Sequence, residues 1–190
     1  GDPRVIASPM GELLAQEVRP PKRELGINIL AMAVTLGYLG VVPPPALETA
    51  VIAQLRTSAI AVLTSDQAVA LSSTQISALT TSQLAALAST NVAALSSTHI
   101  IALTTLQVGS LGTSLFQALE TAQIASLELA DVAVISTGNI RNLLTQQLVA
   151  LGTRQIAALT TGQLASLGST AFLSITTDQI AALQTGKITA

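Results

Sequence analysis

An eight-residue repeat is the feature that most restricts the fold of this chain. From residue 47 onward every eighth position is Leu or Ile, and a second apolar residue stands three positions before each, with Ala68 the weakest member. The clearest copy, Leu79 to Ala86, reads LTTSQLAA. A hydroxyl side chain follows the Leu by two positions in almost every copy, and an amide follows it by four in most copies. Such a fixed period constrains the architecture before any single residue does.

Neither a continuous helix nor a continuous strand fits this period. A helix turns about 100° per residue, so the Leu positions would advance about 80° around it with each repeat and never form one face. The two apolar positions are three residues apart, whereas the faces of a strand alternate with a period of two. The spacing therefore suits a helix that ends and starts again in every repeat.

The start of each short helix is also visible in the sequence. Thr80 and Gln83 have the spacing of a capping box, in which a hydroxyl and an amide satisfy backbone N–H groups at a helix start. The same spacing recurs at Ser72 and Gln75, Thr104 and Gln107, Thr160 and Gln163, and Thr176 and Gln179. The more regular hydroxyl one position later, as at Thr81, Thr105 and Thr161, is an alternative N-cap, and the sequence leaves both open. Either start gives a helix too short to be stable without packing on its neighbours.

We therefore predict an all-α solenoid of short helices, with the Leu and Ile lines inside and the hydroxyl and amide lines at the corners or outside. Small residues near the Leu line, such as Ala85 and Ala86, would let backbones approach closely. Gly112, Gly152 and Gly168 follow the Leu and suit a tight corner. A β-solenoid with ladders of Thr and Gln is the alternative, but abundant Ala, Leu and Gln favour helix.

The chain divides into two parts near residue 45. Residues 1–45 combine a Pro-containing segment with an uncharged stretch, 25–42, which we interpret as a helix that caps the solenoid. That stretch reaches the lower length limit of a transmembrane helix, so a membrane-active role is an alternative. Residues 46–190 are the repeat array. The repeats continue to the last residue without a polar cap, and because solenoids need caps we expect a fragment of a longer array.

Composition restricts the functions open to the chain. Charged residues make up 9%, aromatic residues 2%, and the formal net charge is −2. Nucleic-acid binding is not expected, because the repeats lack a basic cluster and aromatic stacking platforms. A neutral surface of Thr, Ser, Gln and Asn fits a secreted or cell-surface protein, or a segment that associates with copies of itself, better than a cytosolic monomer kept apart by charge.

No group of residues predicts an enzyme, a cofactor or a metal site. The Ser and Thr residues are periodic, as structural caps are, and no phosphate loop, nucleophile elbow or paired carboxylates are present. His99, the single histidine, occupies the amide position of its repeat. We expect it to make a corner hydrogen bond, because a metal site would need at least two further ligands.

The stretch 128–144 departs most from the repeat and is where we place candidate contacts with a partner of unknown identity. Its candidate residues are Glu128, Asp131, Asn139 and Arg141.

The units ALTTSQLAAL at 78–87 and ALTTGQLASL at 158–167 resemble octad repeats of long, low-complexity proteins of Gram-negative bacteria. Those proteins are described as adhesin-like, haemagglutinin-like or calcium-binding surface proteins. The resemblance covers about 47–190 and carries over no functional residue. It implies a non-enzymatic module of a secreted or surface protein, acting as spacer, stalk or adhesion scaffold. Two alternatives are an effector-type scaffold that binds a host protein and a translocator that inserts 25–42 into a membrane.

Overall fold

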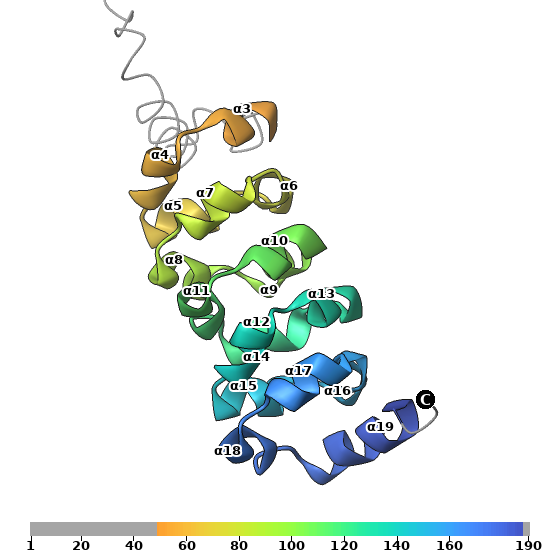
Figure 1. The fold of residues 1–190 in the computed structure, drawn as a ribbon. Coiled ribbons are helices and arrows are strands. Elements are labelled where there is room, and N and C mark those ends of the chain that lie inside the picture. The colour runs from red at the N-terminus through yellow and green to blue at the C-terminus, as the bar shows by residue number, and fades with distance from the viewer. Residues whose placement is uncertain (1–48, 188–190) are drawn as a thin grey trace, which may run out of the picture.

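The computed structural model describes residues 49–187, so the predicted N-terminal segment and cap helix lie outside the described residues. The described part consists of short α-helices without any β-strand (Figure 1). All but the last have four to six residues, and the last has 11. The all-α solenoid is thereby confirmed for these residues, and the β-solenoid is wrong. The helices are α3 Thr49–Gln54, α4 Thr57–Ala61, α5 Ser65–Val69, α6 Ser73–Ser77, α7 Thr81–Ala85, α8 Ser89–Ala94, α9 Ser97–Ile101, α10 Thr105–Ser110, α11 Thr113–Gln117, α12 Thr121–Ser126, α13 Leu129–Val134, α14 Thr137–Arg141, α15 Thr145–Ala150, α16 Thr153–Ala158, α17 Thr161–Ser166, α18 Ser169–Phe172 and α19 Thr177–Lys187.

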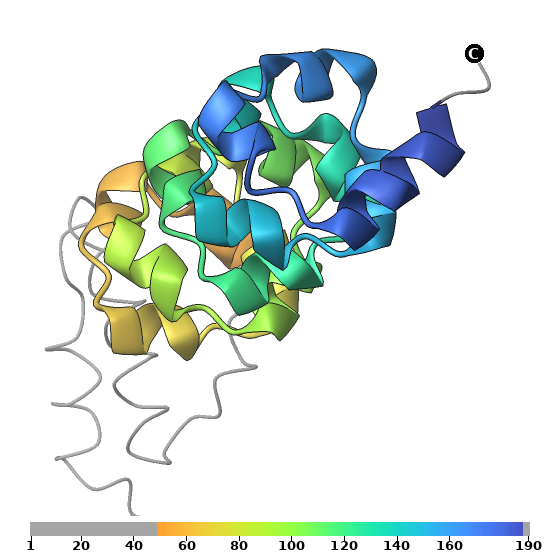
Figure 2. The ribbon, with the colours of Figure 1, turned by 90° about the horizontal axis from the view of Figure 1, so that it is seen from below.

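Three helices make one turn of the coil. Each helix from α3 to α14, and also α16, packs against the third helix after it, so that α10, for example, lies between α7 and α13. Three octads therefore separate a residue from its equivalent in the next turn. Figure 1 shows the turns stacked from α3 to α19, and Figure 2 shows the coil from the end where α19 lies.

The structure decides where each helix starts. Thr80 has an extended backbone (φ −69°, ψ 159°), and its hydroxyl accepts a hydrogen bond from the backbone N–H of Gln83. In return, Oε1 of Gln83 accepts a hydrogen bond from the backbone N–H of Thr80. The first hydroxyl is thus the N-cap, and Thr81 is the first helical residue, so the alternative N-cap is wrong. Capping boxes form at all five predicted places, and at Thr64 with Gln67 and Ser96 with His99.

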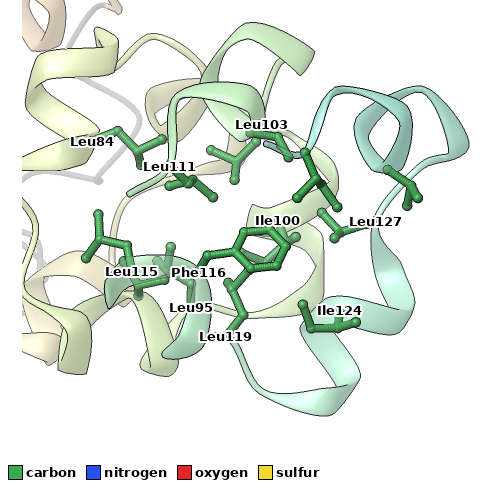
Figure 3. Close-up of a cluster of buried hydrophobic side chains, with 14 of the residues drawn as sticks. Leu84, Leu95, Ile100, Leu103, Leu111, Leu115, Phe116, Leu119, Ile124 and Leu127 are labelled. Carbon is green, nitrogen blue, oxygen red and sulfur yellow. The ribbon is translucent and has the colours of Figure 1, made fainter. Parts of the chain in front are cut away.

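The Leu and Ile lines meet inside the coil and form one continuous aliphatic core. Figure 3 shows side chains of successive helices gathered around Phe116, the largest fully buried side chain, which is 1% exposed. Leu95, Ile100 and Leu119 lie beside it in this view. Because no helix of this length is stable alone, burial of these side chains between turns is what stabilises each helix. Phe172, at the same octad position in α18, is instead 49% exposed.

The glycines of the corners are not there for unusual backbone angles. Gly112, Gly152 and Gly168 are N-cap residues with φ between −67° and −71°, a conformation that any residue adopts. They lie at corners as expected, but the backbone there does not require glycine. Gly109 of α10 matters more, because a Cβ there would lie 3.3 Å from the carbonyl oxygen of Val134 in α13. Its missing side chain lets the two helices stack closely.

Replacing Gly112 by Ser is expected to raise the free energy of unfolding by about 0.5–1 kcal/mol. The helix α11 has no side-chain cap, and a Cβ at residue 112 would meet nothing within 4 Å. The new hydroxyl can accept a backbone N–H, and the unfolded chain loses freedom. Gly112→Ala is the control, since Ala restricts the unfolded chain equally but cannot cap. Urea unfolding that finds the Ala variant as stable as the Ser variant would contradict the cap.

Candidate functional site

The most regular polar feature of the molecule lies inside the corners. The third residue of most helices is a buried amide, 2–6% exposed. The sequence predicts these side chains at the corners or outside, and they lie at the corners but are buried. The buried amides are Gln75, Gln83, Asn91, Gln107, Gln123, Asn139, Gln147, Gln155, Gln163 and Gln179. Buried polar groups require hydrogen-bond partners, so each must be satisfied within the coil.

Gln123 shows how the glutamine is satisfied. Its Oε1 accepts a hydrogen bond from the backbone N–H of Glu120 (2.6 Å), the N-cap of its own helix. Its Nε2 donates to the carbonyl oxygens of Val92 (2.8 Å) and Leu95 (2.6 Å), at the corner one turn back. The amide therefore closes its own helix start and joins it to the preceding turn.

We call this recurring arrangement the amide ladder. Gln83, Gln107, Gln147, Gln155, Gln163 and Gln179 make the same pair of bonds, to carbonyl oxygens 28 and 31 residues earlier in the chain. The ladder runs along the three edges of the coil because corners stack on corners. It satisfies carbonyl groups that the ends of such short helices would otherwise leave without partners.

Asn91 and Asn139 occupy the same position with a shorter side chain and form a different set of hydrogen bonds. Nδ2 of Asn91 and of Asn139 donates to a Leu carbonyl oxygen 28 residues earlier, at 2.8 Å in each case. Their Oδ1 atoms accept hydrogen bonds from the hydroxyls of Ser65 and Thr113, both at 3.1 Å. A hydroxyl from the preceding turn thus replaces the N-cap N–H that Asn is too short to reach.

His99 takes a ladder position, and the predicted corner hydrogen bond is confirmed. Its Nδ1 accepts the backbone N–H of Ser96 at 3.2 Å, which places the proton of the neutral ring on Nε2. The ring also bonds the backbone of Leu71, at the corner one turn back. Burial lowers the pKa of His99 below its ordinary value of 6.5, while the bond to Leu71 acts in the opposite direction.

Asp131 is the one acidic residue in the ladder of the described part, and it is 2% exposed. Burial raises the pKa of Asp131 above its ordinary value of 3.8, and the charge of Glu128 acts in the same direction. A hydrogen bond with the backbone of Glu128 lowers the pKa but does not outweigh these effects. A carboxylate can accept hydrogen bonds at this position but cannot donate one to the preceding turn.

The four candidate partner contacts fall into two classes. Asp131 and Asn139 are each 2% exposed and belong to the ladder. Glu128 is an exposed N-cap residue of α13, and Arg141 is exposed at the end of α14. Of the four, Glu128 and Arg141 are thus the two whose side chains a partner can reach. Two of the four residues that depart from the repeat, Asp131 and Asn139, are therefore buried inside the coil.

An open groove accompanies Glu128 on the outer surface. It is lined by Ala125 and by residues 127–130 and 152–155, with Glu128 and the exposed Leu129 on one turn and Arg154 on the next. Arg154 is not among the residues that the sequence predicts at a contact. The signal that could have found Arg154 is the spacing of three octads, because one turn of the coil places 128–130 beside 152–154.

The array as described contains neither a metal-binding cluster nor a membrane-spanning helix. Within residues 49–187, no three His, Asp or Glu side chains come together in a way that could hold a metal ion. None of the helices described there has the length and apolar character that crossing a bilayer requires.

Comparison with known proteins identifies the repeat in one segment. Residues 124–161 match the family model described as the ALTTAQ repeat. This segment runs from α12 to the start of α17 and includes the groove and the stretch 128–144. Neither a curated protein nor a solved structure matches the chain. A structural repeat module is therefore the function that comparison and fold support together.

Proposed function

We propose that this array is a non-enzymatic spacer in a secreted or cell-surface bacterial protein, where it sets the distance between parts of a longer molecule. The observation that carries the proposal is the amide ladder, in which the same inter-turn bonds recur along the coil. Most corners are therefore fixed to the preceding turn by equivalent bonds. A rod built like this changes length by whole units without changing its construction.

The outer surface supports a location outside the cytosol. Few side chains on it are charged, and its hydroxyl-bearing N-cap and first helical residues, such as Thr80, Thr104 and Thr160, are neutral. Such a surface also allows lateral contact between neighbouring rods. Labelling intact cells with an antibody against the array tests the location, since a cytosolic protein would be labelled only after lysis.

A second candidate function is a scaffold that binds a protein partner on one face. The groove between Glu128 and Arg154 favours it, because an acidic and a basic side chain border an apolar surface that includes Leu129. A scaffold depends on that face, whereas a spacer depends on length alone. Glu128→Ala, Arg141→Ala and Arg154→Ala would impair a scaffold and leave a spacer unchanged.

Deletions of different length distinguish the two functions, because they change the length of the array and leave the groove intact. Removing residues 80–103 takes out three octads, which make one full turn, and leaves every later helix facing the same way. Removing 80–95 or 80–111 takes out two or four octads and turns the later helices by about a third of a revolution. Because packed helices lie about 8–10 Å apart, one turn accounts for about 10 Å of length.

Adhesion of cells that display the full protein is the measurement. For a spacer, we expect adhesion to change steadily with length through the deletions of two, three and four octads. A scaffold that binds through the groove would keep its activity in all three deletions, because each of them leaves 127–130 and 152–155 intact. Undiminished adhesion in all three deletions would overturn the spacer proposal. Far-UV circular dichroism of each variant checks that the shortened coil is folded.

A further inference from the structure

The ladder position makes two opposite chemical demands on one side chain. It must accept a hydrogen bond from the N-cap backbone N–H of its own helix, and it must donate to a carbonyl oxygen of the preceding turn. The glutamine amide meets both demands at every pH, because it carries a carbonyl oxygen and an NH₂ group that do not titrate. A titratable side chain can meet both demands in one protonation state alone.

His99 meets both demands only as the neutral ring. Neutral imidazole has one acceptor nitrogen and one N–H donor, which serve Ser96 and Leu71 respectively. The protonated ring has two donors and no acceptor. Protonation therefore sets an N–H of the ring against the N–H of Ser96, at a position that is 8% exposed.

Asp131 meets both demands only as the neutral acid. Asn91 and Asn139, at the same position of their helices, donate to the Leu carbonyl oxygen 28 residues earlier. The equivalent carbonyl for Asp131 belongs to Leu103. A protonated carboxyl has one O–H donor and one free acceptor oxygen, whereas a carboxylate presents acceptors alone to that carbonyl. Ionisation thus removes the donor from this turn.

Charged neighbours offset neither the protonation of His99 nor the ionisation of Asp131. The helices packed against α9 are α6 and α12, and neither contains a titratable residue, while Glu120, the N-cap of α12, is exposed. Asp66, on α5 before the Leu71 corner, is exposed too.

The charged residues near Asp131 are also exposed. Of the helices packed against α13, α10 contains no titratable residue and α16 contributes Arg154, whose side chain is exposed. Glu128, at the N-cap of α13, is exposed and of the same sign as an ionised Asp131.

We propose that pH changes the strength of two contacts between successive turns, which we call joints, in opposite directions. One is the contact of His99 in α9 with the Leu71 corner, and the other is the contact of Asp131 in α13 with the Leu103 corner. Acid loosens the joint between α9 and the Leu71 corner, because protonated His99 no longer accepts from Ser96. Loss of the Asp131 proton loosens the joint between α13 and the Leu103 corner. The weakest place in the coil consequently moves along the chain as the pH changes.

The direction of each effect follows from proton linkage. Burial lowers the pKa of His99, so the unfolded state binds more protons and stability is lost as the pH falls below 6.5 towards the folded pKa. Burial raises the pKa of Asp131, so the contribution of its proton is complete below 3.8 and is lost as the pH rises through the folded pKa. The two joints thus weaken at opposite ends of the acid range.

Hydrogen exchange of the whole chain at pH 3.5, 5.0 and 7.5, corrected for intrinsic rates, tests the proposal. Asp131→Asn is expected to slow exchange of the α13 amides about tenfold at pH 7.5 and to leave it unchanged at pH 3.5. His99→Gln is expected to slow exchange of the α9 amides about tenfold at pH 5.0 and to leave it unchanged at pH 7.5. Both substitutions install a side chain that the ladder uses elsewhere, so both variants should fold.

Two further variants and a titration complete the test. Asp66→Asn removes an exposed acid and should change exchange in neither α9 nor α13. Gln107→His should make the amides of α10 exchange faster at pH 5.0 than at pH 7.5. Equal effects of Asp131→Asn at pH 3.5 and 7.5 would overturn the proposal for that joint, as would a carboxyl carbon of Asp131 that titrates by NMR at or below 3.8. A proton found on Nδ1 of neutral His99 would overturn it for the other.

Discussion

Gln147→Glu is expected to lower the free energy of unfolding by about 3 kcal/mol at neutral pH. The Gln147 side chain is 2% exposed, and its Nε2 donates to the carbonyl oxygens of Phe116, Gln117 and Leu119 at 2.8–3.1 Å. A glutamate of the same shape replaces that donor by an ionised acceptor and places a buried negative charge against three carbonyl oxygens. Chemical denaturation of both proteins measures the difference.

The neighbouring glutamine provides the control. Gln146 is exposed, so Gln146→Glu makes the same chemical change one residue away and should shift stability by no more than about 0.5 kcal/mol. The loss in Gln147→Glu should also shrink as the pH falls and be smallest below about 4.3, the pKa of unfolded Glu, because burial raises the folded pKa and the protonated acid regains a donor. Equal losses at residues 146 and 147 would show that the buried amide does not join the turns.

Phe116→Ala is expected to cost about 3–5 kcal/mol, the range for removing a fully buried aromatic side chain. Phe116 is 1% exposed and contributes to the core shared by successive turns (Figure 3). Neighbouring helices are held in register by the ladder, so the coil has little freedom to collapse into the space left behind. Urea unfolding followed by circular dichroism measures the loss.

The second phenylalanine gives the comparison for this change. Phe172 has the same octad position in α18 but is 49% exposed, so Phe172→Ala should cost less than about 1 kcal/mol. Phe116→Leu should be milder than Phe116→Ala, because Leu fills most of the space and occupies this position at Leu84 and Leu148. If the two Ala variants were equally destabilised, burial in the core would not explain the role of Phe116.

The octad alone is enough to predict one short helix per repeat and the side chains that fill its core. The spacing of Leu84 and Leu87 fixes which side points inward, and Thr80 with Gln83 marks the helix start. The number of helices per turn cannot be predicted in this way. It depends on the angle at each corner, which the extended backbone at the N-cap sets, and every octad has the same local pattern whatever that angle is.

The burial of the amides escapes prediction for a related reason. Gln is usually exposed, and local sequence explains Gln83 completely as the partner of Thr80 in a capping box. Its second function uses the carbonyl oxygens of Ile52 and Leu55, 31 and 28 residues away, which no local pattern contains. In sequence, Asp131 and Asn139 therefore resemble surface irregularities, because nothing local shows that their position is internal.

The bonds of the amide ladder never join residues more than 31 positions apart, and this span stays the same however many turns the coil contains. The entropy cost of closing a loop depends on its length, so the last turn of a long array closes as cheaply as an early one. Duplication of octads in a gene can therefore lengthen such a protein without slowing the folding of each added turn. Growth by repetition meets no kinetic penalty that rises with size, which accounts for how one simple unit can be copied many times.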